Sequence, residues 1–384
     1  MGENGFSDEG GLPGTIVQAS EHLLIVGASA RAAAGSALRA GLRPWCVDLF
    51  ADADLRAICP AHRLEGRYPH GFAAWFDRAP PGPWMYTGGL ENHPALVRRL
   101  ANLRPLWGND DTALRRARDP FFVAEWLREA GLPVLDVLPP NEPPSPGQWL
   151  IKPRRGAGGQ GIRFHLGQET IAPRNYVQRY VEGEARAAIY VADRAATRLL
   201  ALSRQLVGED WLHASSFQYC GSIGPLPVTA EQEKTLERLG EVLARGCGLR
   251  GLFGVDGVWC DSVFWPVEMN PRYTASVEVL ERATALAALD WHRRAFVSSE
   301  SLPMPASPSG EFVGKAILFA RRELIFPADL LTPGADFADI PDPGQRIEAG
   351  RPILSLFARA DSVEECQAAL RRIAADLDRK LFGG

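Results

Sequence analysis

Lysine, paired cysteines and long apolar runs are scarce or missing in this sequence of 384 residues. Only four of its 42 basic residues are lysines: Lys152, Lys234, Lys315 and Lys380. No two of its six cysteines form a CxxC pair, so their spacing indicates reduced thiols rather than a zinc site or a disulfide framework. No apolar stretch approaches the roughly 20 residues that span a bilayer, so we expect no membrane partner.

The sequence also has no excess of basic over acidic residues. The formal net charge is −4 and the sequence pI is about 6.0, which gives no electrostatic footprint for nucleic acid. The first residues, 1–19, are polar and glycine-rich and carry no basic segment followed by an apolar one, so they are not typical of a secretory signal. We expect a frayed tail on a cytoplasmic protein.

The remaining chain is long enough for two to three domains and begins with an α/β pattern. Leu23–Val26 and Pro44–Asp48 are expected strands on either side of an alanine-rich helix over 30–40. A proline-rich stretch over 139–146 is typical of a connector. From Gln148 onward the pattern indicates hairpins.

The other expected elements follow from apolar periodicity, turn residues and capping signals. Thr229, with Gln232 three positions on, predicts a capping box at the start of a helix. Further helices are expected over 94–102, 120–130, 276–296 and 362–381, and further strands over 84–87, 149–152, 162–165, 176–180, 185–191, 197–205, 252–270 (a hairpin), 314–319 and 352–357.

A glycine loop over 156–161 fits the pattern G-x-G-x-x-G, which occurs in dinucleotide-binding turns. Such a turn opens a helix, whereas here the β-branched and aromatic segment 162–166 predicts a strand. A glycine loop between two strands is a flap whose backbone N–H groups can fold over phosphates. Lys152 stands just before it, and an ammonium suits a single phosphate oxygen. The alternative is a mobile surface hairpin with a solvated lysine.

A second turn, at Gly27, precedes Asp48 by roughly 20 residues, as in NAD-binding units. It lacks the three-glycine pattern, so a structural α/β turn is the favoured interpretation.

The segments around Asp256 and Glu268 predict an acidic hairpin. If Ser262 is the centre of the turn, Asp256 lies opposite Glu268, and Glu268 and Asn270 share a face because side chains alternate along a strand. Carboxylates placed opposite each other repel, and Mg²⁺ held by carboxylates and substrate phosphates would offset that repulsion. Arg272 follows and could stabilise a phosphoryl oxyanion. The alternatives are a solvated acidic hairpin, and for Arg272 an ion pair with Glu268 or Glu278.

These motifs occur in an order that resembles the ATP-grasp enzymes. Ile151-Lys152-Pro153 and the flap resemble their first nucleotide-binding segment, 177–184 their hinge, and Asp256 with 268–272 their metal and catalytic segment. The segments 88–92, 314–318, 339–341 and 347–352 resemble biotin-carboxylase-related members, and the uncharacterised predicted ATP-grasp carboligases are the closest group.

The resemblance implies the roles of individual residues. The nucleotide would be held by Lys152, Gly156, Gly158, Gly159, Gly161, Gln178, Tyr180, Val181 and Glu184. Glu182 competes with Glu184 for the ribose. Asp256, Glu268 and Asn270 would bind Mg²⁺, or Mn²⁺ as an alternative ion, and Arg272 would be catalytic. A second nucleotide lysine common in the family has no counterpart, and Arg118 is its nearest substitute.

The resemblance also implies an α/β fold, α+β in its core. We expect a tail over 1–19, a Rossmann-like pre-ATP-grasp domain over 20–112, an ATP-grasp core over 113–300, and a β-rich C-terminal region with a final helix over 310–384.

The expected function is an ADP-forming ligase that uses ATP and Mg²⁺ to activate a carboxylate as an acyl phosphate and join it to an amine. Its partners would be small-molecule substrates, with a homo-oligomer left open. The alternatives are a carboxylase that activates bicarbonate, a non-catalytic nucleotide-binding regulator, and an NAD-dependent oxidoreductase using Gly27 and Asp48. The segment 213–219 lies over the site or is an ordinary loop.

Overall fold

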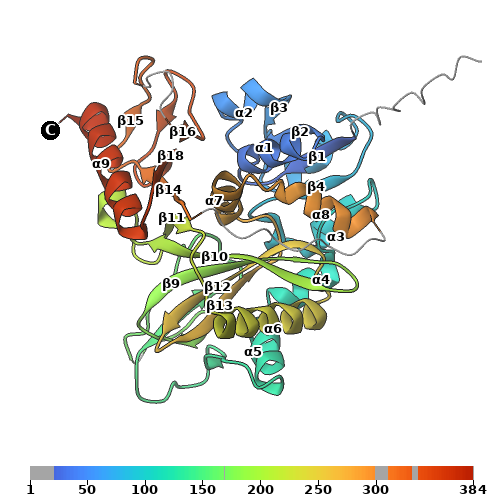
Figure 1. Cartoon of the computed structure of the whole chain (residues 1–384), viewed down its shortest axis with the longest axis vertical. Coiled ribbons are helices and arrows are strands. Elements are labelled where there is room, and N and C mark those ends of the chain that lie inside the picture. Colours follow the sequence, from blue (N-terminus) through green and yellow to red (C-terminus); the bar gives the residue numbers. More distant parts are fainter. Residues whose placement is uncertain (1–20, 168, 299–309, 331–335, 384) are drawn as a thin grey trace, which may run out of the picture.

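The computed structural model describes residues 21–167, 169–298, 310–330 and 336–383. The expected tail over 1–19 lies outside this part of the chain. In Figure 1 the described elements form an upper half, which holds both the N-terminal and the C-terminal regions, and a lower half built on the central residues. None of the described helices combines the length and apolarity that a bilayer span needs.

A parallel sheet of four strands carries the N-terminal region, in the order β3-β2-β1-β4. The expected βαβ unit is present, because β1 and β2 pair in parallel on either side of helix α1. The elements of this region are β1 (His22–Val26), α1 (Arg31–Arg39), β2 (Arg43–Asp48), α2 (Ala53–Ile58), β3 (Ala61–Arg63), η1 (His70–Trp75), β4 (Trp84–Tyr86), η2 (Leu90–Asn92) and α3 (Pro94–Ala101).

A small antiparallel sheet, in the order β5-β8-β6-β7, forms the second unit. Two helices precede it, and the first of them, α4, was not expected from the sequence. Its start is capped by Asp110, whose carboxylate accepts the N–H groups of Thr112 and Ala113. The elements are α4 (Asp111–Ala117), α5 (Pro120–Glu129), β5 (Val137–Leu138), β6 (Trp149–Pro153), β7 (Arg163–Phe164) and β8 (Asn175–Arg179).

A large sheet of eight strands forms the centre of the molecule, in the order β13-β12-β9-β10-β11-β14-β18-β16. Its elements up to the acidic hairpin are β9 (Glu184–Ala192), β10 (Thr197–Val207), η3 (Asp210–Leu212), β11 (Tyr219–Gly224), α6 (Ala230–Cys247), β12 (Gly251–Cys260) and β13 (Val263–Asn270). Helix α6 begins with the expected capping box, in which Thr229 Oγ1 accepts the Gln232 N–H and Gln232 Oε1 accepts the Thr229 N–H.

The single helix expected over 276–296 is wrong, because the chain forms two helices there. Helix α7 (Ala275–Thr284) ends at Ala285, which has a φ of 57°, and α8 (Ala288–Val297) follows. The buried carboxylate of Glu281 accepts the Ala288 N–H and so connects the two helices. A buried polar contact therefore decides a break that apolar periodicity does not reveal.

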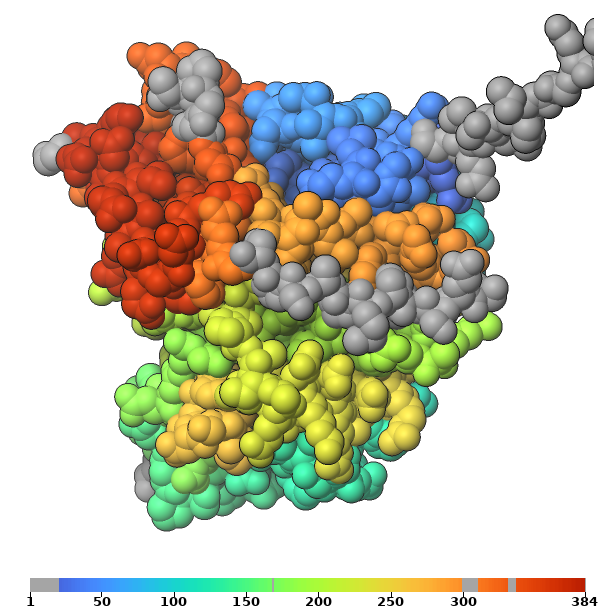
Figure 2. All heavy atoms as spheres, viewed as in Figure 1, coloured from blue at the N-terminus to red at the C-terminus, as the bar shows by residue number. Residues whose placement is uncertain are grey.

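The C-terminal strands fall into two sheets: most of them continue the large sheet, and two short ones form a separate pair. β11 pairs with β14, and β14 pairs with β18, so pairing runs from the core into the last region. The elements are β14 (Phe312–Phe319), β15 (Leu324–Ile325), β16 (Phe337–Ala338), β17 (Arg346–Ile347), β18 (Pro352–Ala360) and α9 (Val363–Phe382). Figure 2 shows this region (red) beside the N-terminal region (blue), above the central residues.

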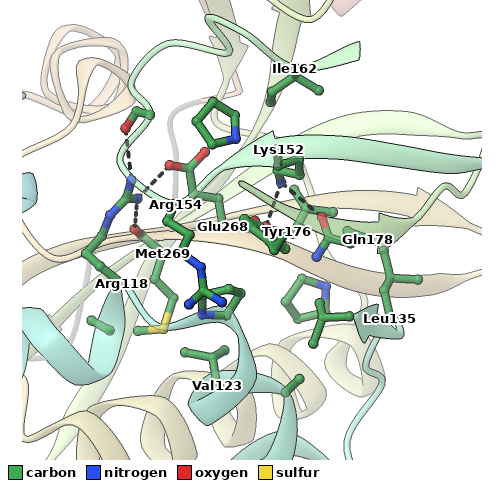
Figure 3. A pocket seen from close by; sticks show the side chains of 18 of the residues that line it. Arg118, Val123, Leu135, Lys152, Arg154, Ile162, Tyr176, Gln178, Glu268 and Met269 are labelled. Atoms are coloured by element: carbon green, nitrogen blue, oxygen red, sulfur yellow. Dashed lines mark hydrogen bonds and ion pairs between the residues drawn. The ribbon is translucent and has the colours of Figure 1, made fainter. Parts of the chain in front are cut away.

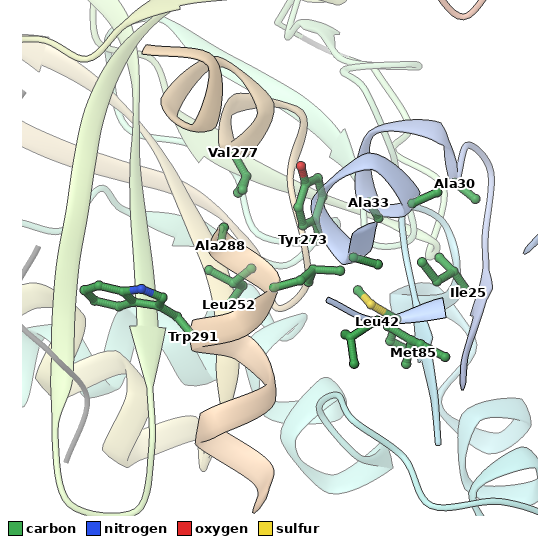
Figure 4. Packing of buried hydrophobic residues seen from close by; sticks show 14 of the residues in the cluster. Ile25, Ala30, Ala33, Leu42, Met85, Leu252, Tyr273, Val277, Ala288 and Trp291 are labelled. Atoms are coloured by element: carbon green, nitrogen blue, oxygen red, sulfur yellow. The ribbon is translucent and has the colours of Figure 1, made fainter. Parts of the chain in front are cut away.

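One buried apolar cluster joins the N-terminal region to the core. Ile25 and Ala33 from β1 and α1 belong to the same cluster as Leu252, Tyr273 and Trp291. Figure 4 shows these side chains from α1, β12 and the α7–α8 segment packed between the elements. The ends of the N-terminal strands are thereby held close to the acidic hairpin.

Candidate active site

A cleft of about 680 Å³ separates the small sheet from the large sheet. Lys152 and Gln178 line it from β6 and β8, and Asp256 and Glu268 line it from β12 and β13. Ser216, Phe217 and Tyr219 also line it, so the segment that follows His213 borders the site, as one of the two interpretations expected. His213 itself points elsewhere, with Nε2 2.9 Å from Asp378 in α9.

The acidic hairpin has the expected register. Asp256 pairs with Glu268, and the turn falls at Asp261 and Ser262, both with positive φ. Asp256 Oδ2 accepts a hydrogen bond from Asn270 Nδ2 at 2.8 Å. Burial, together with the nearby charge of Glu268, raises the pKa of Asp256 to about 7. The repulsion expected from the sequence is therefore present in the fold.

Glu268 is held differently, by cations. Arg118 Nη1 donates to Glu268 Oε1 at 2.6 Å. Burial alone would raise the pKa of Glu268, but the charges of Arg118 and Lys152 hold that pKa below its usual value. One carboxylate of the pair thus stays ionised, and the other ionises near neutral pH.

The donor set fits a divalent cation of the Mg²⁺ kind. Such ions take oxygen ligands and are bound by one or two carboxylates plus substrate phosphates. Among the described residues, no three His, Cys, Asp or Glu side chains cluster in a way that could hold a metal by themselves. Asn270 and phosphate oxygens would have to complete the site. Because Asn270 turns its nitrogen toward Asp256, its amide would have to rotate to offer oxygen to the ion.

Lys152 is buried, with 6% of its surface exposed, so the interpretation as a solvated surface lysine is wrong. Its Nζ donates to Gln178 Oε1 and to the Val267 carbonyl, both at 3.0 Å. Figure 3 shows Lys152 and Gln178 turned toward each other, and Arg118 against Glu268, around a smaller pocket beside the cleft. The ammonium group of Lys152 therefore lies on the wall of the cleft, where two hydrogen-bond acceptors hold it.

The glycine loop connects two strands, as expected for a flap. β6 and β7 pair antiparallel on either side of it, and no helix begins at the loop. The loop lies against the segment after His213, because Tyr219 N–H donates to the Gly158 carbonyl at 3.2 Å. A Cβ atom at Gly159 would lie 1.7 Å from the Phe217 carbonyl oxygen. The close approach of the flap to this segment thus requires glycine.

The expected hinge residues lie on the same cleft. Gln178, Tyr180 and Val181 line it, and so does Glu184. Glu182, the competitor for the ribose, is not part of the lining. Glu184 accepts a hydrogen bond from Arg186 Nε at 2.5 Å, which orients its carboxylate. Of the two candidate glutamates, only Glu184 lines the cleft.

Arg272 lines the cleft. Its side chain pairs with neither Glu268 nor Glu278, which were the two carboxylates expected as its structural partners. Its Nε donates to Glu91 Oε1 at 2.8 Å, and its Nη2 donates to Asn270 Oδ1 at 3.0 Å. Glu278 instead binds Arg31 and Lys315. Glu91 comes from η2, so the N-terminal region positions Arg272 through an ion pair.

Sequence reasoning missed three residues that shape the site. Glu91 positions Arg272, and Asn92 Nδ2 donates to the Gly156 carbonyl at 3.1 Å. Gln205 donates to Asp256 Oδ1 at 2.9 Å. A lone amide in the apolar strand β10 was the available signal for Gln205. Glu91 and Asn92 stood in a segment singled out only for its resemblance.

The turn at Gly27 has a structural role. Asp48 is buried, and its carboxylate accepts N–H groups from Ala30 at 2.8 Å, Phe50 at 3.0 Å and Ala51 at 2.6 Å. With these three bonds Asp48 holds two loops at the ends of β1 and β2. This bonding supports the structural interpretation over an NAD-binding one.

The sequence of the core matches a known domain. Residues 117–276 match the family model described as an ATP-grasp domain, and the chain contains that domain. A curated relative, the carbamoyl phosphate synthase large chain of Beutenbergia cavernae, is 25% identical over 228 residues. The alignment covers 50% of this chain and 20% of that protein, so the chain spans about a fifth of the relative's length.

Solved structures share the fold over nearly the whole chain. The biotin carboxylase domain of 2-oxoglutarate carboxylase from Hydrogenobacter thermophilus has a TM-score of 0.72 at 14% identity, with 93% of this chain and 89% of that chain covered. N5-carboxyaminoimidazole ribonucleotide synthetase from Thermus thermophilus has a TM-score of 0.68 at 17% identity, with 94% and 99% covered. Phosphoribosylamine–glycine ligase from Thermotoga maritima has a TM-score of 0.67 at 18% identity, with 94% and 98% covered. These similarities show the ATP-grasp fold.

Proposed function

We propose that this protein is a cytoplasmic ligase that uses Mg-ATP to activate a carboxylate as an acyl phosphate and joins it to an amine, releasing ADP and phosphate. The arrangement of Asp256, Glu268, Asn270 and Arg272 across the cleft from Lys152 carries the proposal. The named relatives lend support, since the phosphoribosylamine–glycine ligase is by its name a carboxylate–amine ligase.

In this proposal each part of the nucleotide has its own contacts, at residues of the cleft and of the adjoining flap. Gln178, Tyr180 and Val181 would hold the adenine, and Glu184 the ribose. Lys152 and the backbone of the flap, at Gly156, Gly158, Gly159 and Gly161, would hold the inner phosphates. Asp256, Glu268 and Asn270 would hold Mg²⁺, which when bound would neutralise charge on the outer phosphates.

The chemistry would then consist of two displacements. A substrate carboxylate oxygen forms a bond to the γ-phosphorus, and the bond to the ADP oxygen breaks. The amine nitrogen next attacks the acyl carbon and loses a proton, and inorganic phosphate leaves. Phosphoryl transfer needs mainly positioning and charge stabilisation from the protein. Arg272, oriented by Glu91, would stabilise charge on the transferring group.

The test is the nucleotide product. Purified full-length protein is incubated with Mg-ATP and mixtures of carboxylates and amines, and nucleotides are separated by chromatography. We expect ADP and phosphate in equal amounts, only with the correct carboxylate. Glu268→Gln and Arg272→Ala should lower turnover, and Arg272→Ala should leave ATP affinity nearly unchanged because its contact forms mainly in the transition state. AMP and pyrophosphate as coupled products would refute this mechanism.

Bicarbonate is the second candidate for the activated carboxylate. The biotin carboxylase domain of 2-oxoglutarate carboxylase, whose fold matches 93% of this chain, was solved in complex with MgADP and bicarbonate. Isotope-labelled bicarbonate separates the two candidates. Incorporation of the label into product would favour carboxylation, and ADP release without bicarbonate would favour the amide-forming ligase.

A further inference from the structure

A second pocket, of about 310 Å³, lies next to the nucleotide cleft. Four arginines line it: Arg115, Arg118, Arg154 and Arg155. They come from the end of α4 and from the segment between β6 and the flap. Glu91 and Asn92 of η2 also line it. We call this hollow the arginine pocket.

Two ion pairs link the arginine pocket to the cleft. In the first, Arg118 lines the pocket and its partner Glu268 lines the cleft, at 2.6 Å. In the second, Glu91 lines the pocket and its partner Arg272 lines the cleft, at 2.8 Å. The pocket therefore lies directly behind the residues that would surround the transferring phosphoryl group.

The positive charge of the pocket exceeds what its acidic residues neutralise. Within the described residues, Arg154 and Arg155 have no ion-pair partner, and Arg115 reaches only Asp111, at 3.8 Å. The one further carboxylate in the lining, Asp119, accepts the N–H groups of Phe121 and Phe122 at the start of α5. Such a surplus of guanidinium groups favours an anionic ligand, because their planar donors match carboxylate and phosphate oxygens.

Two contacts show that the pocket is built rather than fortuitous. Arg118 has a buried Nε atom without any hydrogen-bond partner, although its other nitrogens bind Glu268, Asn92 and the Gly156 carbonyl. Arg154 lies over the Phe121 ring, with 4.8 Å between its guanidinium carbon and the ring centroid. The three partners of Arg118 hold its guanidinium in place, and the Phe121 ring does the same for Arg154.

We propose that the arginine pocket binds a second anionic group, a carboxylate or a phosphate, on the substrate whose first carboxylate is activated. This inference rests on the proposed function, because it places the reacting carboxylate in the cleft beside Arg272. The distal anion then lies among Arg115, Arg154 and Arg155. The substrate class is a small acid with at least two negative groups.

Calorimetric titration of the full-length protein tests this assignment. The probes are acetate, succinate and inorganic phosphate, each with and without a saturating non-hydrolysable Mg-ATP analogue. We expect succinate to bind at least about tenfold more tightly than acetate, since its second carboxylate gains contacts that acetate lacks. Phosphate shows which anion the pocket prefers: tighter binding of phosphate than of succinate would assign the distal group as a phosphate.

Charge-removing variants locate the binding. Arg115→Gln and Arg155→Gln lie outside the cleft lining, so each should weaken succinate or phosphate binding about tenfold while leaving the affinity for the nucleotide unchanged. The matched control is Arg372→Gln, an exposed arginine on α9 that has no ion-pair partner in the described residues, and it should change neither affinity.

The outcomes separate this inference from the proposed function. Equal binding of succinate and acetate, no binding of any probe, or unchanged probe binding in both arginine variants overturns the anion site, even if the nucleotide binds normally. Wild-type protein that fails to bind the nucleotide contradicts the proposed function, whatever the probes do.

Discussion

At the scale of single residues, Lys152 shows how the choice between two cations decides a site. The chain uses arginine almost everywhere, yet a lysine is buried between Gln178 and the Val267 carbonyl. A guanidinium is wider and planar and cannot occupy the same position. We predict that Lys152→Arg weakens Mg-ATP binding by at least about tenfold, or roughly 1.4 kcal/mol, in calorimetric titrations.

Lys234 provides the control for this substitution. It lies exposed on α6, so Lys234→Arg should bind Mg-ATP like the wild type. Wild-type affinity in Lys152→Arg would mean that the ammonium does not contact the nucleotide.

At the scale of elements, the flap depends on a close contact between two loops. Gly158 and Gly159 both have positive φ, 60° and 78°, so a side chain strains the backbone at either position. Only at Gly159 would a Cβ collide with the Phe217 carbonyl, whereas nothing lies within 4 Å at Gly158. We predict that Gly159→Ala weakens Mg-ATP binding about tenfold more than Gly158→Ala, measured by calorimetry.

The comparison isolates the contact from backbone strain, because both variants share the strain. Equal affinities in the two variants would show that the approach of the flap to Phe217 does not matter for binding.

A second element-scale contact fixes α8 to β12. His292 is buried, and its Nδ1 accepts the Leu252 N–H at 2.9 Å while its Nε2 lies 3.1 Å from the Trp107 carbonyl. Burial lowers the pKa of His292 to about 4 from its usual 6.5. As the pH falls, His292 therefore binds a proton in the unfolded chain before it does so in the folded protein. The free energy of unfolding decreases from about pH 6.5 down to about pH 4.

We predict that lowering the pH from 7 to 5 costs the wild type about 2 kcal/mol more unfolding free energy than it costs His292→Gln, which lacks this titration. Urea unfolding at both pH values measures the difference. An identical pH dependence in the two proteins would contradict a buried neutral imidazole.

At the scale of the whole molecule, one buried charge cluster joins three regions. Glu278 of α7 accepts hydrogen bonds from Arg31 of α1 at 2.7 Å and from Lys315 of β14 at 2.8 Å. Arg31 also binds Asp339 near the C-terminal strands, at 2.9 Å. Burial would raise the pKa of Glu278, but Lys315 and Arg31 lower it to about 2. Helix α7, which follows the acidic hairpin, is thereby tied to both the N-terminal and the C-terminal regions.

We predict that Glu278→Ala lowers the free energy of unfolding by about 3–5 kcal/mol, since it leaves two buried cations with less compensation. The control is Glu323→Ala, which breaks the exposed pair with Arg346 and should cost at most about 1 kcal/mol. Urea titrations compare the two variants, and similar small losses in both would show that the cluster does not stabilise the fold.

The sequence by itself determined those features of the protein that depend on residues close together in the chain. The opposition of Asp256 and Glu268 follows from strand alternation and from the turn at Asp261 and Ser262, which lies between the two partners. The flap between two strands and the capping box at Thr229 are local in the same way. The order of these motifs was enough to predict the ATP-grasp fold.

Only the tertiary structure decided which distant groups meet at the site. Arg272 and Glu91 are 181 residues apart, and Arg118 and Glu268 are 150 residues apart. No local pattern encodes such pairs, because they form only when separate regions pack, as the cluster around Tyr273 shows. The same reason applies to the break at Ala285, where Ser36 of α1 hydrogen-bonds both Glu281 and the Leu289 N–H, and to the continuation of the large sheet into most of the C-terminal strands.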